Sequence, residues 1–254
     1  MKTVLTIAGS DSIGGAGIEA DIKTISLSGL HPMTTITAVT MQNTLGVKDI
    51  FPVSPDFVYN CIQNIFDDIT PNAVKIGMLY SDETALAVFK ALKERKAKNI
   101  VLDPILISGT GQSLSNDNII KVFENNFFGF CTLVTPNAQE ASKILNMRIE
   151  TVDDAKKTAK ILDNKFKTSF LIKGGHLNDN EAYDVLISNG KISVFSNPRI
   201  PNCDPHGTGC VLSSKIATNL ALGKDIHDSV YDAKNYLYEK MKNAKQIGKG
   251  KKLL

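Results

Sequence analysis

The sequence alternates short, nearly continuous apolar runs with longer amphipathic segments along most of its 254 residues. Runs rich in Val, Ile and Leu without polar alternation are typical of strands that are buried on both faces of a parallel sheet. Six such runs predict strands, at residues 3–9, 34–40, 73–78, 99–106, 132–137 and 169–175. The alternation therefore predicts an α/β protein, in which a mostly parallel sheet lies between two layers of helices.

The amphipathic segments between these runs predict helices that each pack one face on the sheet. They lie at residues 18–27, 55–66, 82–96, 118–127, 138–145, 152–166, 209–222 and 226–242. No internal repeat, low-complexity run or linker rich in proline and glycine divides the chain. Residues 1–254 are therefore expected to form a single domain.

Composition argues against several classes of protein. The net charge is +3 and the basic residues are dispersed, so no nucleic-acid-binding stripe is predicted. No apolar stretch reaches the length of a membrane span, and the apolar run at the N-terminus is too short for a signal peptide. The four cysteines form no Cys-x-x-Cys pair, which argues against a zinc site or a disulfide framework. We therefore expect a cytoplasmic protein that has neither a nucleic-acid nor a membrane partner.

Polar and glycine-rich clusters fall mainly at the C-terminal ends of the predicted strands. The clusters AGSDSIGGAG, MQNT, KIGML, LDPIL, TPNAQE and IKGGH occupy residues 8–17, 41–44, 75–79, 102–106, 135–140 and 172–176. In open α/β sheets, ligands bind outside the carboxyl ends of the strands, and these ends share one edge of the sheet. The sequence therefore predicts one shared ligand site at this edge.

A glycine-rich segment also precedes one of the last predicted helices. Gly207, Thr208, Gly209 and Cys210 stand at its start. The unpaired N–H groups and the partial positive charge of a helix N-terminus attract anions, and glycine lets the backbone approach them closely. The segment is consistent with a phosphate cradle beside a reactive thiol. It is equally consistent with a Gly-Thr turn that caps an ordinary helix.

Charged residues at the strand ends suggest how phosphates could be held. Asp103 and Glu140 end adjacent strand–helix units, and their oxygens suit Mg²⁺ better than zinc. Lys173 ends an apolar strand and could pair with a nucleotide phosphate. For Glu140, capping of the following helix is the alternative interpretation.

Other motifs narrow the choice of enzyme class. The chain lacks the GxxxxGK[ST] motif of P-loop nucleotidases and the GxSxG motif of α/β hydrolases. The segment GGAGIEAD does not match the GxGxxG motif of dinucleotide-binding proteins. A kinase that binds phosphates at a glycine-rich helix start remains the best hypothesis.

These motifs together resemble a known family. The ordered series TIAGSDSIGGAGIEADIKT, MQNT, VKIGML, VLDPIL, TPNAQEA, IKGGH and HGTGC is similar to the hydroxymethylpyrimidine/phosphomethylpyrimidine kinases of thiamin synthesis. The resemblance implies a ribokinase-like fold and transfer of the γ-phosphate of ATP to 4-amino-5-hydroxymethyl-2-methylpyrimidine. A second phosphate is then added to the monophosphate. It further implies ATP and Mg²⁺ as cofactors and a homodimer, because relatives without a separate lid often dimerise.

The resemblance also implies roles for individual residues. Gly207, Thr208 and Gly209 match the family's anion hole, and Cys210 matches the residue that takes the proton of the substrate hydroxyl. The positions that match the pyrimidine site are Gly9, Asp11, Ala16, Gln42, Met78 and His206. On the Mg-ATP side the matching positions are Asp103, Asn137, Glu140 and Lys173, with Asp103 and Glu140 as candidate metal ligands.

Physical chemistry is consistent with these roles. Phosphoryl transfer passes through a loose transition state, so a thiol with a pKa of roughly 8.5, lowered by a helix N-terminus, could serve as the base. The Gln42 side chain carries an acceptor and a donor on one planar group, which matches the amino group and ring nitrogen of an aminopyrimidine. For this reason a pyrimidine is preferred over a B6 vitamer. A pyridoxine or pyridoxal kinase of the same superfamily is the alternative, and a non-catalytic ligand-binding protein on this fold is a third hypothesis.

One segment departs from the family pattern. After VLDPIL the family usually has a small residue followed by Lys-Ser-Gly-Asp, whereas this chain reads Ile-Ser-Gly-Thr-Gly-Gln at residues 107–112. Gly109 stands in place of the lysine and Gln112 in place of the acid. A lysine contact to a substrate phosphate is therefore absent from this position, which bears on the second phosphorylation. Backbone N–H groups of the glycine-rich segment could replace it.

Overall fold

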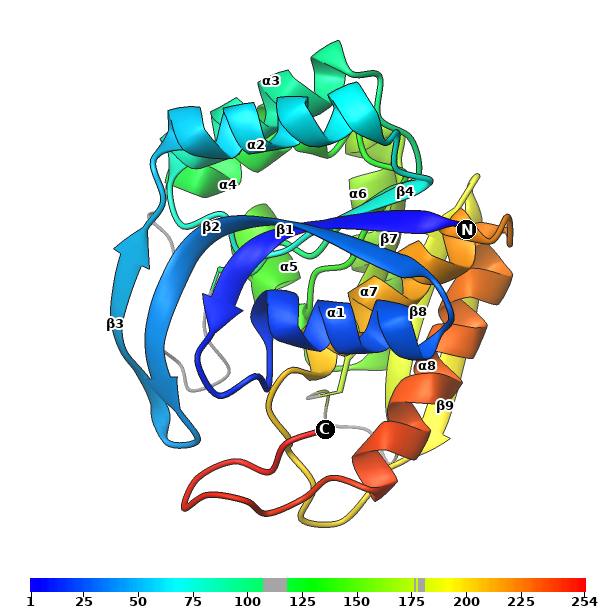
Figure 1. The fold of residues 1–254 in the computed structure, drawn as a ribbon. Coiled ribbons are helices and arrows are strands. Elements are labelled where there is room, and N and C mark those ends of the chain that lie inside the picture. Colours follow the sequence, from blue (N-terminus) through cyan, green and yellow to red (C-terminus); the bar gives the residue numbers. More distant parts are fainter. Residues whose placement is uncertain (107–117, 176, 178–180) are drawn as a thin grey trace.

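The computed structural model describes residues 1–106, 118–175, 177 and 181–254 (Figure 1). Within this part of the chain, nine strands form one sheet. In sheet order they are β3 (Gly46–Pro52), β2 (His31–Asn43), β1 (Thr3–Asp11), β4 (Ala73–Ile76), β5 (Ile100–Leu102), β6 (Leu133–Val134), β7 (Ser169–Gly174), β8 (Glu181–Ser188) and β9 (Lys191–Pro198). Residues 107–117, which include Gly109 and Gln112, lie outside the described residues.

The six predicted strands are confirmed as a parallel block. They correspond to β2, β1, β4, β5, β6 and β7, which pair as parallel neighbours in this order. Strands β5 and β6 are shorter than predicted. Pro104 and Pro136 follow closely, and proline offers no N–H donor to a strand ladder.

Three further strands escaped the sequence prediction. β3 pairs with one edge of the parallel block, and β8 and β9 extend the other edge, all with antiparallel pairing. β3 and β9 are exposed or only partly buried along most of their length, so they lack the continuous apolar run that identifies an interior strand.

Helices cover both faces of this sheet (Figure 1). The helices are α1 (Gly17–Leu27), α2 (Pro55–Asp68), α3 (Asp82–Glu94), α4 (Asn118–Val122), η1 (Phe123–Phe127), α5 (Ala138–Leu145), α6 (Val152–Phe166), α7 (Thr208–Ala221) and α8 (Ile226–Lys242). The helices from α2 to α6 share one apolar core with the sheet, whereas α1, α7 and α8 share the other. Alternate strand residues supply the two cores: Leu5 and Ile7 of β1 face the first, and Val4 faces the second. The predicted three-layer α/β/α architecture is confirmed.

One predicted helix changes its geometry part of the way along. The segment 118–127 is α-helical only to Val122 and continues as a single π-helical turn, in which the N–H of Phe128 donates to the carbonyl of Phe123 at 2.9 Å. The rings of Phe123, Phe127 and Phe128 all lie in the first core. Those of Phe123 and Phe127 meet edge to face, with centroids 5.6 Å apart. The change of backbone geometry therefore coincides with close aromatic packing in this core.

The sequence analysis predicted no membrane-spanning segment, and the helices can be compared with that prediction. None of them, within the described residues, combines the length and apolar character that a bilayer-spanning helix needs.

Candidate active site

A cavity of about 920 Å³ opens at the carboxyl edge of the parallel strands. The residues that the family resemblance assigned to the site all line it: Gly9, Asp11, Ala16, Gln42, Met78, Asp103, Asn137, Glu140, Lys173, His206, Gly207, Thr208, Gly209 and Cys210. They come from segments far apart in the chain, and they meet because parallel strands present their carboxyl ends at one edge.

The start of α7 forms one wall of this cavity. Gly207, the residue before the helix, has a φ of 87°, a left-handed conformation that glycine adopts most readily. A Cβ at this position would overlap the carbonyl of Gly15, so the loop between β1 and α1 lies directly against it. A glycine has no side chain with which to cap the helix. The first-turn N–H groups are therefore positioned to bind an anion.

Cys210 lies in this first turn and is 6% exposed. Burial raises the pKa of its thiol to about 11; the Lys75 ammonium counteracts this rise, and the Asp21 carboxylate adds to it. The prediction that the helix N-terminus lowers this pKa is therefore wrong. The loss of hydration destabilises the thiolate by more than the nearby Lys75 ammonium stabilises it.

Three charged side chains meet on the cavity wall beside this first turn, where a Cβ on Gly209 would lie 3.2 Å from Asp103 Oδ2 and 3.4 Å from Lys173 Nζ. Lys173 Nζ lies 2.5 Å from Asp103 Oδ1 and 4.0 Å from Glu140 Oε2. Burial by itself would lower the pKa of Lys173, but the two carboxylates outweigh it and raise this pKa. Burial also raises the pKa of Glu140 to about 7, against the opposing effect of Lys173 and with a further rise from Asp103. The wall thus holds a compact, water-poor cluster of one cation and two acids.

The helix-capping interpretation of Glu140 also holds. Its Oε2 accepts from the N–H of Asn137 at 2.7 Å, and Asn137 Oδ1 accepts from the N–H of Glu140 at 2.8 Å. This reciprocal pair is a capping box at the start of α5. Glu140 therefore has a structural role whether or not its carboxylate also meets a ligand.

Few side chains at this site could bind a metal ion directly. Within the described residues, no group of three or more His, Cys, Asp and Glu side chains lies close enough to hold a metal ion. Asp103 and Glu140 alone would suit Mg²⁺ that retains several waters and is also bound by phosphates.

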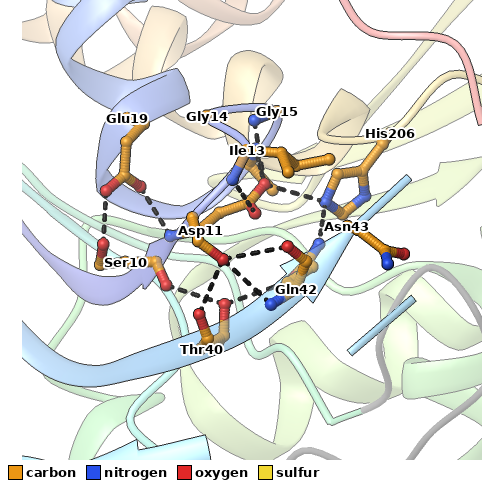
Figure 2. A network of polar contacts seen from close by, with 12 residues as sticks. Ser10, Asp11, Ile13, Gly14, Gly15, Glu19, Thr40, Gln42, Asn43 and His206 are labelled. Atoms are coloured by element: carbon orange, nitrogen blue, oxygen red, sulfur yellow. Dashed lines mark hydrogen bonds and ion pairs between the residues drawn. The ribbon is translucent and has the colours of Figure 1, made fainter. Parts of the chain in front are cut away.

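A polar network surrounds Gln42 on the remaining wall (Figure 2). The side-chain nitrogen of Gln42 lies 2.5 Å from His206 Nε2, which in turn lies 3.2 Å from Asp11 Oδ2. A protonated Nε2 can satisfy both neighbours only if Gln42 turns its amide oxygen toward the ring. The amide nitrogen of Gln42 would then face Thr40 Oγ1, which donates to the carbonyl of Ser10 at 3.0 Å.

Asp11 anchors this network. Its carboxylate accepts from the N–H groups of Gly15 and Ala16 at 2.9 and 2.8 Å, in addition to its contact with His206. Burial by itself would raise the pKa of Asp11, but the hydrogen bonds from His206 and the backbone lower it. Asp11 therefore stays ionised and ties the β1–α1 loop to His206.

The sequence analysis assigned no role to two features at this site. Lys75 lies fully buried beneath the site and pairs with Asp21 at 2.8 Å. Its position inside the apolar run AVKIGM is the sequence feature that could have indicated it. Residues near the C-terminus also reach the cavity, where Lys251 is part of the lining. The glycine pattern IGKG at residues 247–250 was their available signal.

Comparison with known proteins shows which family has this arrangement. A family model described as phosphomethylpyrimidine kinase matches residues 11–254. A hydroxymethylpyrimidine/phosphomethylpyrimidine kinase of Aquifex aeolicus is 38% identical over 250 residues, which cover 98% of each chain. The crystal structure of a phosphomethylpyrimidine kinase from Clostridium difficile 630 superposes with a TM-score of 0.84 at 38% identity, covering 94% of this chain and 99% of that one. An ADP complex of Bacillus subtilis pyridoxal kinase superposes with a TM-score of 0.91 at 30% identity, covering 100% and 96%.

The fold and the cavity define a small-molecule kinase of the ribokinase-like type. Its sheet carries helices on both faces, and its cavity lies at the carboxyl edge of the parallel strands. Within this class, the chain belongs to the phosphomethylpyrimidine kinase family. The resemblance found in the sequence is thereby confirmed.

Proposed function

We propose that this protein transfers the γ-phosphate of ATP to 4-amino-5-hydroxymethyl-2-methylpyrimidine, and then a second phosphate to the monophosphate. The observation that carries the proposal is a single cavity that the Gln42 amide, the start of α7 and the Lys173 cluster line together. This arrangement accommodates an aminopyrimidine, a phosphoryl group in transfer and a nucleotide at the same time. The Aquifex aeolicus relative carries the name of this activity.

In the proposed reaction the chain mainly positions groups and neutralises charge. The first-turn N–H groups of α7 bind the oxygens of the transferred phosphoryl group. Cys210 Sγ accepts the proton of the attacking hydroxymethyl group, and Lys173 faces the phosphates. Cys210 and Asp103 are both buried, which limits the access of water to this part of the cavity.

ATP and Mg²⁺ are the cofactors in this proposal. The relative from Bacillus subtilis was determined as an ADP complex, which supports a nucleotide site on the shared fold. The phosphates of ATP, Asp103 and Glu140 would hold Mg²⁺, partly through water, and the ion would offset negative charge on the phosphates.

A B6 vitamer is the alternative acceptor, and the high TM-score to a pyridoxal kinase favours considering it. The deciding experiment measures kcat/KM with ATP for the pyrimidine alcohol, its monophosphate, pyridoxine and pyridoxal. The proposal expects the highest value for one of the two pyrimidines. A higher value for either vitamer would replace the proposed substrate, and no turnover of any acceptor would support a non-catalytic ligand-binding protein.

Changing Gln42 to leucine is expected to raise KM for the pyrimidine alcohol and to leave KM for ATP nearly unchanged. The substitution removes a polar partner and leaves a buried ligand group unpaired, which costs about 1–3 kcal/mol, or roughly 10–100-fold in KM. Steady-state kinetics with each substrate varied in turn measure the effect. Gln139→Leu, on the Asn137 side of the cavity, is the matched control. Equal losses for both substrates would show that Gln42 stabilises the end of β2 and does not contact the ring.

A rise of kcat/KM with pH is also expected. The thiolate is the proton acceptor, and the pKa of Cys210 is raised to about 11, so the active fraction grows as the pH approaches that value. Between about pH 7 and 9 the slope should approach tenfold per pH unit. A pH profile for the pyrimidine alcohol measures it, and Cys210→Ala should lack this dependence. A plateau below about pH 8 would contradict a base with so high a pKa.

Two further expectations remain proposals. A homodimer is supported by the exposed apolar side chains of the β2–β3 hairpin, which are Val39, Met41, Leu45 and Phe51. A cytoplasmic location is supported by four cysteines that are all free thiols.

A further inference from the structure

Residues 244–254 form a strap that leaves the end of α8 and returns to the cavity. Figure 1 shows it as the red segment that leads to the C-terminus. The strap is held as a narrow hairpin, in which Lys245 and Leu253 exchange backbone hydrogen bonds of 2.9 Å in both directions. Its turn is closed by Gln246, whose side-chain amide donates to the carbonyl of Gly250 at 2.8 Å. It therefore has a defined backbone shape of its own.

Backbone hydrogen bonds attach the strap at two places, and both belong to the wall around Gln42. Lys251 N–H donates to the carbonyl of Thr44 at 2.9 Å, and Gly250 N–H donates to Thr44 Oγ1 at 3.0 Å. Thr44 stands two residues after Gln42, at the turn between β2 and β3. At the other place, His206 N–H donates to the carbonyl of Lys252 at 2.9 Å. Consecutive strap residues thus bind the two segments that carry Gln42 and His206.

The fit at the first attachment is tight. A Cβ on Gly250 would overlap the backbone of Thr44, and one on Gly248 would overlap its side chain. Close packing continues at the second attachment, because a Cβ on Gly15 would lie 2.8 Å from Leu253 Cδ2 and 2.9 Å from His206 Cδ2. Because these contacts are close-packed, a displacement of the strap would also move the Thr44 turn and the His206 segment.

We propose that the strap is a positioning element for substrate recognition, because it holds the Thr44 turn and the His206 segment together so that Gln42 and His206 meet at the ring site. These two side chains are 164 residues apart in the chain and depend on tertiary contacts to meet. The strap spans the gap between their segments through backbone hydrogen bonds. Its role in recognition rests on the proposed function, whereas its role in holding the two segments does not.

Gly250→Ala is the primary test. The added methyl group would displace the strap from Thr44, and KM for the pyrimidine alcohol is expected to rise about tenfold or more, while KM for ATP changes less than about twofold. Gly129→Ala is the matched control, because a Cβ there would make an ordinary contact of 3.6 Å with the carbonyl of Phe166. A purely structural role would lower stability or raise both KM values together.

Limited trypsin digestion supplies a readout that does not depend on activity. The strap carries Lys245, Lys249, Lys251 and Lys252. Cleavage at these lysines, identified by mass spectrometry, should be slowed by the pyrimidine alcohol in the unaltered protein. In Gly250→Ala it should be faster and insensitive to the ligand.

The outcomes separate the inference from the proposed function. Faster cleavage with an unchanged pyrimidine KM would overturn the inference, as would a parallel rise in both KM values. If Gly250→Ala fails to fold, Thr44→Val takes its place: it keeps the side-chain shape, removes one acceptor, and should raise the pyrimidine KM about threefold or more. If the protein phosphorylates only a B6 vitamer, the proposed function fails. The same comparison of KM values and cleavage, made with that vitamer, then decides the role of the strap.

Discussion

Cys210→Ala is expected to lower turnover about 10²–10⁴-fold while the affinity for ATP stays close to that of the unaltered protein. This range is typical for the loss of a general base. The thiol is 6% exposed, in the first turn of α7 and on the cavity wall, so the hydroxyl of a bound acceptor can reach it. Alanine preserves the helix and the N–H groups of its first turn, and the proposed phosphate site should therefore remain intact.

The measurement is kcat for the pyrimidine alcohol together with ATP binding by calorimetry. Cys203→Ala is a matched control, because Cys203 lines the same cavity and its Sγ lies 3.4 Å from the carbonyl of Met241. This control should retain nearly full turnover. If Cys210→Ala kept more than about a tenth of normal turnover, the thiol would be a packing residue at a helix start and not the base.

Lys75→Met is expected to lower the free energy of unfolding by about 3–5 kcal/mol, the range found when one partner of a buried ion pair is removed. Lys75 and Asp21 side chains are both 0% exposed, with Nζ 2.8 Å from the carboxylate. Thr6 Oγ1 donates to the same carboxylate at 2.5 Å, and Ser214 on α7 also donates to it. Methionine fills a similar volume but leaves the carboxylate without a counter-charge, beneath the turn that carries Cys210.

Urea unfolding curves of three variants test this expectation. Lys75→Met and Asp21→Asn should each destabilise the protein, and the double variant should recover part of the loss because no charge is then left unpaired. A loss below about 1 kcal/mol for Lys75→Met would place this pair in the range of exposed ion pairs and would contradict the argument.

Much of the site could be predicted from the sequence because of sheet topology. Gln42, Asp103 and Lys173 each end or follow a parallel strand, and parallel strands bring such positions to one edge. Glu140 was found at a predicted strand–helix junction, and Cys210 was found beside the glycines at a predicted helix start. By contrast, the strap at 244–254 and the edge strand β3 carry no apolar periodicity, because exposed or partly buried residues dominate both. Their positions depend on partners that are distant in the chain.

By itself, the sequence determined the three-layer fold, because strands buried on both faces leave a pattern that is visible without coordinates. The same pattern brought the polar strand ends, such as Asp103 and Lys173, to one edge of the sheet. Only the tertiary structure decided the chemistry of those residues. Cys210 has a raised pKa, and Glu140 has a pKa of about 7, because the surrounding elements remove water from both groups. The meeting of Gln42 with His206 was likewise decided by the tertiary structure. Desolvation and long-range contact are sums over many neighbours, and no local stretch of sequence contains them.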